Sequence, residues 1–466
     1  MSEEKLNTSQ KALQINMDAT KYGAFAEIGA GQETARWFFR VGGASGTVAK
    51  TISAYDMTVS DAIYGTAERY VSRQRLQAML DYEWKLLLER LDSKRGDKTT
   101  FFVFANTVAT RSFSKKESEG HGWLGVRFQT QPHEPSSEII IHVRLLDPDG
   151  QREQEALGII GVNLIHGAFN LHGGPAKLIG SLLDDLTNQR IEVDMIKFSG
   201  PRFAGLDNRL MALQLVTQWL TDATLFTADG EAVIPGEVLY KKPVLVERGS
   251  FRPLTNPMLD MLEQSQAQFA REEALQGEPP VVLLEMTLRQ LQVGDAIDHR
   301  DFLDRVDMLS TLGKPVLISN FLRYHRLVMY LSRHTRKPIG LPLGLVRLWD
   351  ILDEKFYTDM EGGLLESLGQ LFKNGARLYV YPSLNRKSGE LHTLESMPIP
   401  SHLKHLYTHL VENRFIQNIV KYNPDHLTAY SGDVLDKIKA GDPSWEKSVP
   451  PPIAEVIKAK KLFGCK

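Results

Sequence analysis

One stretch decides the fold of the second half of the chain: Val244-Leu245-Val246-Glu247-Arg248-Gly249-Ser250-Phe251-Arg252-Pro253-Leu254-Thr255-Asn256-Pro257-Met258-Leu259. An apolar run of strand length leads into a turn that contains Gly249, and an amphipathic helix starts near Asn256. Such a junction directs unpaired backbone N–H groups and the positive end of a helix toward one point. The stretch therefore predicts a place where a phosphate group binds.

Downstream of this stretch, short apolar runs alternate with helical patterns. We expect strands at residues 281–285, 315–319, 338–343 and 377–381, and helices at residues 300–312, 324–334 and 345–356. Strands that are separated by helices of this length pair in parallel through right-handed crossovers. Residues 243–441 are therefore predicted to form a mostly parallel, Rossmann-like sheet with helical crossovers.

The first half of the chain has a different pattern. A long helix is expected at residues 68–91, and strands are expected at residues 101–104, 123–128, 139–145 and 159–164, the last two separated by a turn at residues 147–150. We therefore predict an α/β protein with two domains. Residues 1–242 form an α/β domain of unknown role with several antiparallel strands, residues 243–441 form the second domain, and residues 442–466 form an extended Pro-rich tail.

The composition is that of a globular protein. Of the 466 residues, 42% are hydrophobic and 24% are charged, and these fractions exclude a disordered or collagen-like chain. The formal charge of −2 provides no net basic field for nucleic acid or for an anionic membrane. The single cysteine, Cys465, cannot form an internal disulfide, and no signal peptide is recognisable. We therefore expect a cytoplasmic protein that binds neither nucleic acid nor a membrane.

The turn after the first strand of the second half resembles a motif of the nicotinamide- and nicotinate-mononucleotide adenylyltransferases, in the nucleotidyltransferase superfamily. Gly249, Ser250, Phe251, Pro253 and Thr255 match that motif. The whole chain also resembles a family of bacterial proteins that carry conflicting functional labels, adenylyltransferase among them. The resemblance implies a nucleotidyltransferase-like domain, which would use Mg²⁺ to transfer a nucleotidyl group from a triphosphate.

Three positions depart from the motif, and they bear on catalysis. Arg252 replaces an acid or amide, Pro257 replaces a glycine, and Met258 replaces the histidine that in the family donates to the triphosphate. Because a thioether has no hydrogen to donate, we expect ligand binding without efficient adenylyl transfer. No catalytic residue is assigned, and an ordinary corner between a strand and a helix is the alternative interpretation.

A second group of polar residues follows another expected strand. Asn320 and Arg323 come after the strand at residues 315–319, in a weak echo of the family's second motif, and Gly344 follows the next strand. Ligands in open α/β sheets bind beyond the carboxyl ends of strands, where arginines form an anion-binding rim. The predicted phosphate- or nucleotide-binding residues are Gly249, Ser250, Phe251, Arg252, Thr255, Asn320 and Arg323.

Two other motifs carry weaker signals. Gly29-Ala30-Gly31 separates a strand from a helix, but Thr34 stands where a dinucleotide fingerprint has glycine or alanine. His402, His405 and His409 share one helix face at the spacing of zinc ligands. That helix lacks the glutamate of a zinc protease, and its leucines form the buried stripe, so we expect its imidazoles to face solvent or another subunit. We predict no metal site.

Two functions of different classes fit these observations. In the first, the C-terminal domain binds a nucleotide or a phosphorylated metabolite, and nucleotidyl transfer is the implied chemistry. In the second, the chain is a non-catalytic cytoplasmic protein that self-assembles or regulates. The Pro-rich tail and the histidine-bearing helix offer surfaces that a monomer does not need, so we expect a homo-oligomer.

Overall fold

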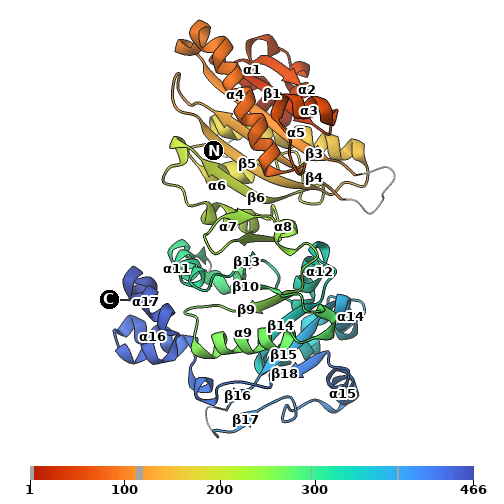
Figure 1. The fold of residues 1–466 in the computed structure, drawn as a ribbon, viewed down its shortest axis with the longest axis vertical. Coiled ribbons are helices and arrows are strands. Elements are labelled where there is room, and N and C mark those ends of the chain that lie inside the picture. The colour runs from red at the N-terminus through yellow and green to blue at the C-terminus, as the bar shows by residue number, and fades with distance from the viewer. Residues whose placement is uncertain (1–4, 112–118, 295, 386–387, 466) are drawn as a thin grey trace. The chain divides into compact units, whose positions relative to one another are not determined.

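The computed structural model describes residues 5–111, 119–294, 296–385 and 388–465. The chain is an α/β protein with mixed sheets, and it divides into two compact units, Met1–Asp222 (unit 1) and Ala223–Lys466 (unit 2). Each unit has one large sheet (Figure 1). Each unit also has a hydrophobic core of its own. Within the described ranges, no helix has the length and the apolar character needed to cross a membrane.

Unit 1 contains a six-stranded sheet in the order β2-β1-β3-β4-β5-β6. Its strands are β1 (Lys21–Ile28), β2 (Val48–Ile52), β3 (Thr100–Ala109), β4 (Gly120–Phe128), β5 (Ser137–Leu145) and β6 (Ile191–Ser199). β1 pairs in parallel with β2 and β3, whereas β3, β4, β5 and β6 are antiparallel to one another in turn. The antiparallel strands expected in the first half are present, and parallel strands form the other edge.

Helices cover both faces of this sheet. The hydrophobic core on one face includes side chains of α1 (Thr8–Asn16), α2 (Glu33–Arg40), α5 (Gly150–Asn170), α6 (Pro175–Ser181) and α7 (Asn208–Thr217). On the other face lies α4 (Arg73–Arg95). A Cβ atom on Gly125 of β4 would lie 2.9 Å from the Leu80 side chain, so the glycine permits α4 to approach the sheet closely.

The apolar segment 159–164 is helical, so the strand predicted there is wrong. It lies inside α5, which begins after Asp149, whose side chain caps the first turn. Ile160, Val162 and Leu164 have no exposed surface, although they point in different directions around the helix. A helix that is buried all round has no polar face, and hydrophobic periodicity cannot distinguish such a segment from a buried strand.

Unit 2 contains an eight-stranded sheet in the order β18-β15-β14-β9-β10-β13-β7-β8. Its strands are β7 (Ala223–Phe226), β8 (Ala232–Val233), β9 (Val244–Arg248), β10 (Val281–Thr287), β13 (Val316–Ser319), β14 (Ile339–Gly344), β15 (Arg377–Tyr381) and β18 (Ile416–Asn418). The strands from β18 to β13 are parallel, and β7 and β8 add an antiparallel edge. Numbered along the chain, the parallel strands have the order 3-2-1-4-5-6 of doubly wound folds.

Helices lie on both faces of the parallel sheet. They include α9 (Asn256–Phe269), α11 (His299–Ser310), α12 (Tyr324–His334), α13 (Leu345–Leu352) and α14 (Gly363–Leu371). The core on one face joins α12, α13 and α14 to Val244 and Val246 of β9. On the other face, Leu245 of β9 and Phe269 of α9 both lie close to the position that a Cβ on Gly340 would occupy. α9 and α13 therefore pack on opposite faces.

The division between the units lies earlier than expected. β7 pairs with β13, so unit 2 begins at residue 223 and not at residue 243. The C-terminal residues are not extended, because α17 (Pro451–Lys460) is a helix with Ile453 and Ile457 buried. Pro451 occupies the first turn of α17, where a missing N–H costs no helical hydrogen bond.

Candidate functional site

The neighbouring strands β9 and β14 part at their carboxyl ends. They pair only through Ile339 with Val244 and Gly340 with Leu245, although both strands continue beyond these residues. The order of the parallel strands reverses between β9 and β14, and the helices that follow them pack on opposite faces. Doubly wound folds bind their ligands at this place. We call residues 247–258 and 343–347 the switch point.

A buried ion pair lies at the carboxyl end of β9. The Arg248 guanidinium forms hydrogen bonds of 2.8 and 2.9 Å with the Glu285 carboxylate of β10. Ser319 of β13 donates a hydrogen bond of 2.6 Å to the same carboxylate, and the Tyr324 ring lies 4.5 Å from the guanidinium carbon. Burial alone would lower the pKa of Arg248, but the charge of Glu285 and its hydrogen bonds to the guanidinium together outweigh burial and raise that pKa. These groups hold the ends of three neighbouring strands together.

The turn after β9 is held by packing and hydrogen bonds. Phe251 has a φ of 45° and is fully buried, and its ring lies where a Cβ on Gly249 would be only 2.8 Å away. Arg305 of α11 donates a hydrogen bond of 3.0 Å to the carbonyl oxygen of Ser250. Arg252 donates to Asp301 of α11 at 2.5 Å. The predicted phosphate loop is therefore tied to α11, and Phe251 serves its packing.

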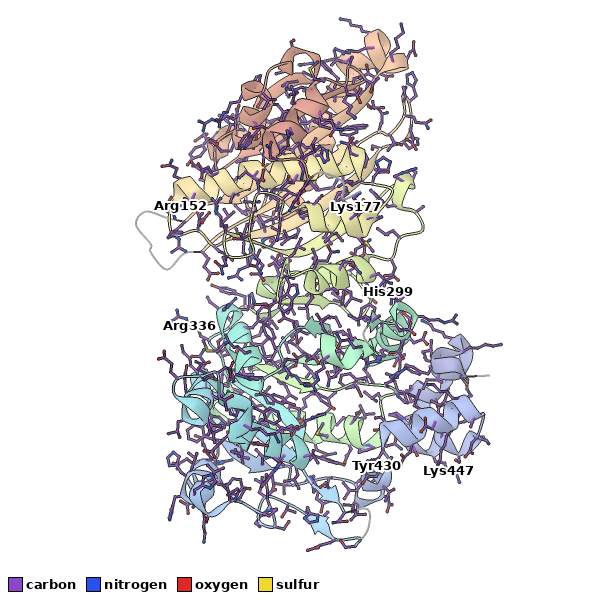
Figure 2. The ribbon with its side chains drawn as sticks, turned by 180° about the vertical axis from the view of Figure 1, so that it is seen from behind. Arg152, Lys177, His299, Arg336, Tyr430 and Lys447 are labelled. Atoms are coloured by element: carbon purple, nitrogen blue, oxygen red, sulfur yellow. The ribbon has the colours of Figure 1, made fainter. Side chains whose placement is uncertain are left out.

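The first turn of α9 has no side-chain cap. Thr255 is the N-cap residue, yet its side chain accepts no hydrogen bond from the helix, and Pro257 lacks an N–H group. Asn256 donates a hydrogen bond of 2.9 Å to the carbonyl oxygen of Lys447, which is labelled in Figure 2. The Met258 sulfur accepts a hydrogen bond of 3.8 Å from the hydroxyl of Ser431. The C-terminal segment therefore packs against the start of α9.

Asn320 and Arg323 follow β13, which β10 separates from β9. Arg248 donates a hydrogen bond of 3.4 Å to the carbonyl oxygen of Leu322, so this loop does reach the end of β9. Arg323 itself pairs with Asp359 at 2.7 Å. The predicted residues thus fall into two groups, one on the turn after β9 and one on the turn after β13. The guanidinium groups of Arg252 and Arg323 pair with different acids.

The sequence interpretation missed a buried acid at the switch point. Glu247 is 1% exposed, and neither of its carboxyl oxygens has a hydrogen-bond partner among the described residues. Burial raises its pKa well above the ordinary value for a glutamate. The Glu247 side chain lies on the same face of β9 as Leu245, toward α9, because side chains alternate along a strand. A glutamate within an apolar strand was the signal that could have identified it.

The start of α13 leaves space beside the end of β14. Gly344 is the N-cap residue of α13, and no side chain caps this helix. A Cβ atom on Gly344 would meet no other atom within 4 Å. Its φ of −82° is ordinary, so the position would accept other residues without backbone strain. The switch point thus brings together two helix N-termini without side-chain caps.

In unit 1, the dinucleotide-like loop already holds an acid. The buried Glu27 carboxylate accepts hydrogen bonds of 3.1 Å from the Thr34 N–H and 2.9 Å from the Ala35 N–H, at the start of α2. Burial raises its pKa to about 7. A Cβ on Gly29 would lie 1.8 Å from the carbonyl oxygen of Val108, so this glycine is required by close strand packing. The helix end that would bind pyrophosphate is occupied by the protein itself.

The histidine-bearing helix does not assemble metal ligands. This helix is α15 (Lys404–Glu412), and His402 precedes it in the chain. His402 pairs with Glu354 at 2.9 Å, and His409 contacts Asn413 at 3.2 Å. Among the residues that the structure describes, no three His, Cys, Asp or Glu side chains form a group that could hold a metal ion.

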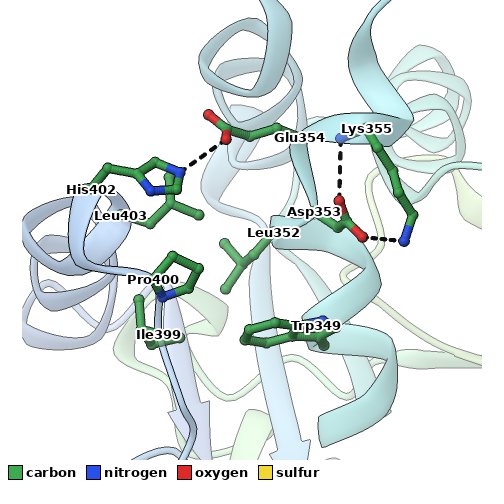
Figure 3. A pocket seen from close by; sticks show the side chains of 9 residues that line it. All are labelled: Trp349, Leu352, Asp353, Glu354, Lys355, Ile399, Pro400, His402 and Leu403. Atoms are coloured by element: carbon green, nitrogen blue, oxygen red, sulfur yellow. Dashed lines mark hydrogen bonds and ion pairs between the residues drawn. The ribbon is translucent and has the colours of Figure 1, made fainter.

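Unit 2 also has an apolar cavity of about 340 Å³ between the end of α13 and residues 399–403 (Figure 3). Its apolar lining consists of Trp349, Leu352, Ile399, Pro400 and Leu403. The charged groups at its rim pair with each other, Glu354 with His402 and Asp353 with Lys355. This cavity therefore presents no unpaired cation to a phosphate group.

The fold defines an α/β protein with mixed parallel and antiparallel sheets. No protein-family model matches the chain, and no curated protein matches it. Several solved structures are similar to part of it, among them the following three. The competence/damage-inducible protein CihA from Agrobacterium tumefaciens is 18% identical, with 35% of this chain and 97% of that chain covered and a TM-score of 0.25.

The other two structures belong to the competence-damaged protein (CinA) superfamily. The protein from Enterobacter cloacae is 11% identical, covers 36% of this chain and 95% of its own, and has a TM-score of 0.26. The protein from Klebsiella pneumoniae 700603 is also 11% identical, covers 34% of this chain and 93% of its own, and has a TM-score of 0.26. These scores support no argument about function, and the comparisons do not show the resemblance to mononucleotide adenylyltransferases.

Proposed function

We propose that unit 2 binds a nucleotide or another phosphorylated metabolite at the switch point. One observation carries the proposal: the parallel strands have the order 3-2-1-4-5-6, and β9 and β14 part at their carboxyl ends where this order reverses. Helices leave such a point on both faces of the sheet, and their N-termini present backbone N–H groups and a positive potential to an anion.

The residues at the switch point support an anionic ligand. The first turns of α9 and α13 lack side-chain caps, so their N–H groups are available to phosphate oxygens. Gly344 leaves space for a ligand beside the backbone. A buried carboxyl with a raised pKa, such as that of Glu247, donates a hydrogen bond while it is protonated.

The residues predicted from the sequence take different parts in this proposal. Gly249, Ser250 and Thr255 provide the turn and the helix start that face the phosphate, while Phe251 packs the turn. Arg252 and Arg323 are ion-paired, so they contact the ligand only by exchanging partners. Asn320 lies on the second turn and is the amide that could reach the ligand from there.

Nucleotidyl transfer is the finer form of the proposal. This chemistry depends on positioning and on stabilisation of charge, and Mg²⁺ brought in with a triphosphate would supply neutralisation of the phosphate charge. Met258 contacts Ser431 and supplies no hydrogen-bond donor. We therefore propose ligand binding as the function, with transfer of a nucleotidyl group slow or absent.

A thermal-shift titration tests this function. The full chain is titrated with nucleotides, mononucleotides and sugar phosphates, with and without Mg²⁺, and with the matching unphosphorylated nucleosides as controls. A ligand at a hundred times its Kd stabilises the folded state by about 2.7 kcal/mol, which is readily measured. Stabilisation by phosphorylated compounds alone is expected. If no phosphorylated compound stabilises the chain, the proposal fails.

A non-catalytic protein that self-assembles or regulates in the cytoplasm is the second candidate. The packing of Met258 against the C-terminal segment favours this second candidate. Met258 makes a structural contact at the position where the adenylyltransferase motif has its phosphate-binding histidine. We propose a homo-oligomer in either case. Light scattering over a broad concentration range tests this, and the mass of a single chain throughout would reject it.

A further inference from the structure

Unit 1 holds a chain of three polar side chains on β4, β5 and β6. Oδ1 of Asp194 lies 2.6 Å from Nδ1 of His142, and Nε2 of His142 lies 3.3 Å from Nδ1 of His121. The side chains of Asp194 and His142 are buried, whereas His121 is only partly buried. Nε2 of His121 has no hydrogen-bond partner among the described residues.

A β-bulge places Asp194 beside His142. His142 of β5 pairs with Met195 of β6, and Val143 pairs with Val193, so Asp194 is the extra residue on β6. A bulge interrupts the hydrogen-bond ladder and redirects a side chain, and bulges are frequent next to active sites. The sheet therefore departs from regular pairing at the point where the carboxylate meets the imidazole.

The contacts determine which imidazole nitrogens carry hydrogen. A carboxylate at Asp194 only accepts hydrogen bonds, so Nδ1 of His142 donates to it. Nε2 of a neutral His142 then accepts a hydrogen bond from Nδ1 of His121, which leaves the lone pair of His121 on Nε2. Burial and the neighbouring His142 lower the pKa of His121 to about 4, so its neutral form persists at neutral pH.

The charged groups nearby are engaged with each other. Arg144 of β5 pairs with Glu192 of β6 at 2.5 Å, and it also pairs with Glu119. The guanidinium opposes a positive charge on His121, whereas the Asp194 carboxylate favours one. Of the two imidazoles, His142 is the one whose ring nitrogen lies directly beside the Asp194 carboxylate.

We propose that His121, His142 and Asp194 form a proton relay in which His121 acts as a general base toward water or toward the hydroxyl group of a ligand. The O–H bond breaks with its electron pair left on oxygen, and the proton binds Nε2 of His121. The Nδ1 proton of His121 passes to Nε2 of His142. The positive charge then lies on His142, where Asp194 stabilises it. Asp194 and His142 are positioning residues in this relay.

Acylation of the full chain by diethyl pyrocarbonate tests the state of His121, because only an unprotonated imidazole nitrogen attacks this anhydride. A bond forms between Nε2 and the carbonyl carbon, ethyl carbonate leaves, and the Nδ1 proton passes to His142. Peptide mass spectrometry gives the rate at His121 and at His405, an exposed imidazole of α15.

Between about pH 7.5 and about pH 5.5, an ordinary imidazole of pKa about 6.5 loses about tenfold in its rate of acylation. His121 is expected to lose less than about twofold, because its pKa lies lower.

Two variants test the relay itself. His142→Phe and Asp194→Asn are each expected to slow acylation of His121 by about tenfold or more, since the acceptor for its Nδ1 proton is lost or misoriented. Glu192→Gln is the matched control, because it makes the same change of carboxylate to amide on β6 at a residue that pairs with Arg144. This control is expected to leave the rate at His121 unchanged.

The proposal fails if His121 loses reactivity in parallel with His405 at low pH, or if His142→Phe reacts as fast as the wild-type chain. Thermal unfolding of each variant shows whether it is folded. Where a variant does not fold, imidazole nitrogen NMR of the wild-type chain decides instead. Hydrogen on Nδ1 of both His121 and His142 supports the relay, and hydrogen on Nε2 of His121 overturns it.

Discussion

Arg248 and Glu285 form two hydrogen bonds, of 2.8 and 2.9 Å, between the neighbouring strands β9 and β10. The side chains are 6% and 0% exposed, so the charges are removed from water and depend on one another. The hydroxyl of Ser319 on β13 donates a further hydrogen bond to the Glu285 carboxylate. The pair thus fixes the end of β9, and with it the turn that begins at Gly249.

The variant Glu285→Gln is expected to be strongly destabilised. It leaves the Arg248 charge buried without its counter-ion, and such a change costs about 3 to 5 kcal/mol of the free energy of unfolding. Urea unfolding of the full chain measures the loss. The matched control is Asp350→Asn in the exposed pair of Arg347 with Asp350, where little change is expected. Equal effects of the two variants would contradict the assignment.

The fold of unit 2 follows largely from the sequence, because its strands and helices alternate and glycines such as Gly249 and Gly344 mark where strands end. The order of strands in the sheet does not follow, since it depends on tertiary packing. The sequence therefore indicated the turn after β9 but not that the strand order reverses between β9 and β14. Glu247, Arg248 and Glu285 escaped notice for a related reason, because periodicity identifies an apolar strand but does not show which charges within it pair.

The variant Gly344→Asp separates ligand binding from stability. An aspartate at the N-cap of α13 accepts hydrogen bonds from the first turn, and replacing a glycine cap with such a residue stabilises a helix by roughly a few tenths of a kcal/mol. Its carboxylate also occupies the place proposed for phosphate. We expect a higher melting temperature and a loss of stabilisation by phosphorylated ligands, both read in thermal-shift titrations.

The control for this variant is Gly344→Ala. A methyl group fits there without a clash, and alanine neither caps the helix nor carries charge. Ligand-induced stabilisation is expected to persist in the alanine variant. If Gly344→Asp still responds to phosphorylated ligands as the wild-type chain does, the phosphate lies elsewhere.

Glu27 is expected to make the stability of unit 1 depend on pH. Its pKa is raised by burial from 4.5 to about 7 in the folded chain, so the folded state binds its proton more tightly than the unfolded state. The stabilisation is complete below about pH 4.5 and is lost as the pH rises to about 7, by about 3 kcal/mol.

The variant Glu27→Gln isolates this effect, because an amide does not titrate. Its free energy of unfolding is expected to be lower overall, since an amide caps α2 poorly, but it lacks the fall between about pH 4.5 and about pH 7. Urea unfolding across this range, with amide hydrogen exchange read on α2, gives both curves. Parallel curves for the variant and the wild-type chain would show that another group titrates.

Adenylyl transfer to nicotinamide or nicotinate mononucleotide is expected to be absent or very slow. Met258 stands where the adenylyltransferase motif that the sequence resembles has a histidine, and the Met258 sulfur contacts the hydroxyl of Ser431. Because a thioether cannot donate to the charge that develops on phosphate, the reaction loses a preorganised donor, which costs roughly a hundred- to a thousandfold in rate. The assay supplies ATP, Mg²⁺ and either mononucleotide and follows pyrophosphate release, and turnover near about one per second would contradict the prediction. Met258→His and its control Met258→Leu identify the cause, since an increase in rate confined to the histidine variant would show that the missing donor limits the reaction.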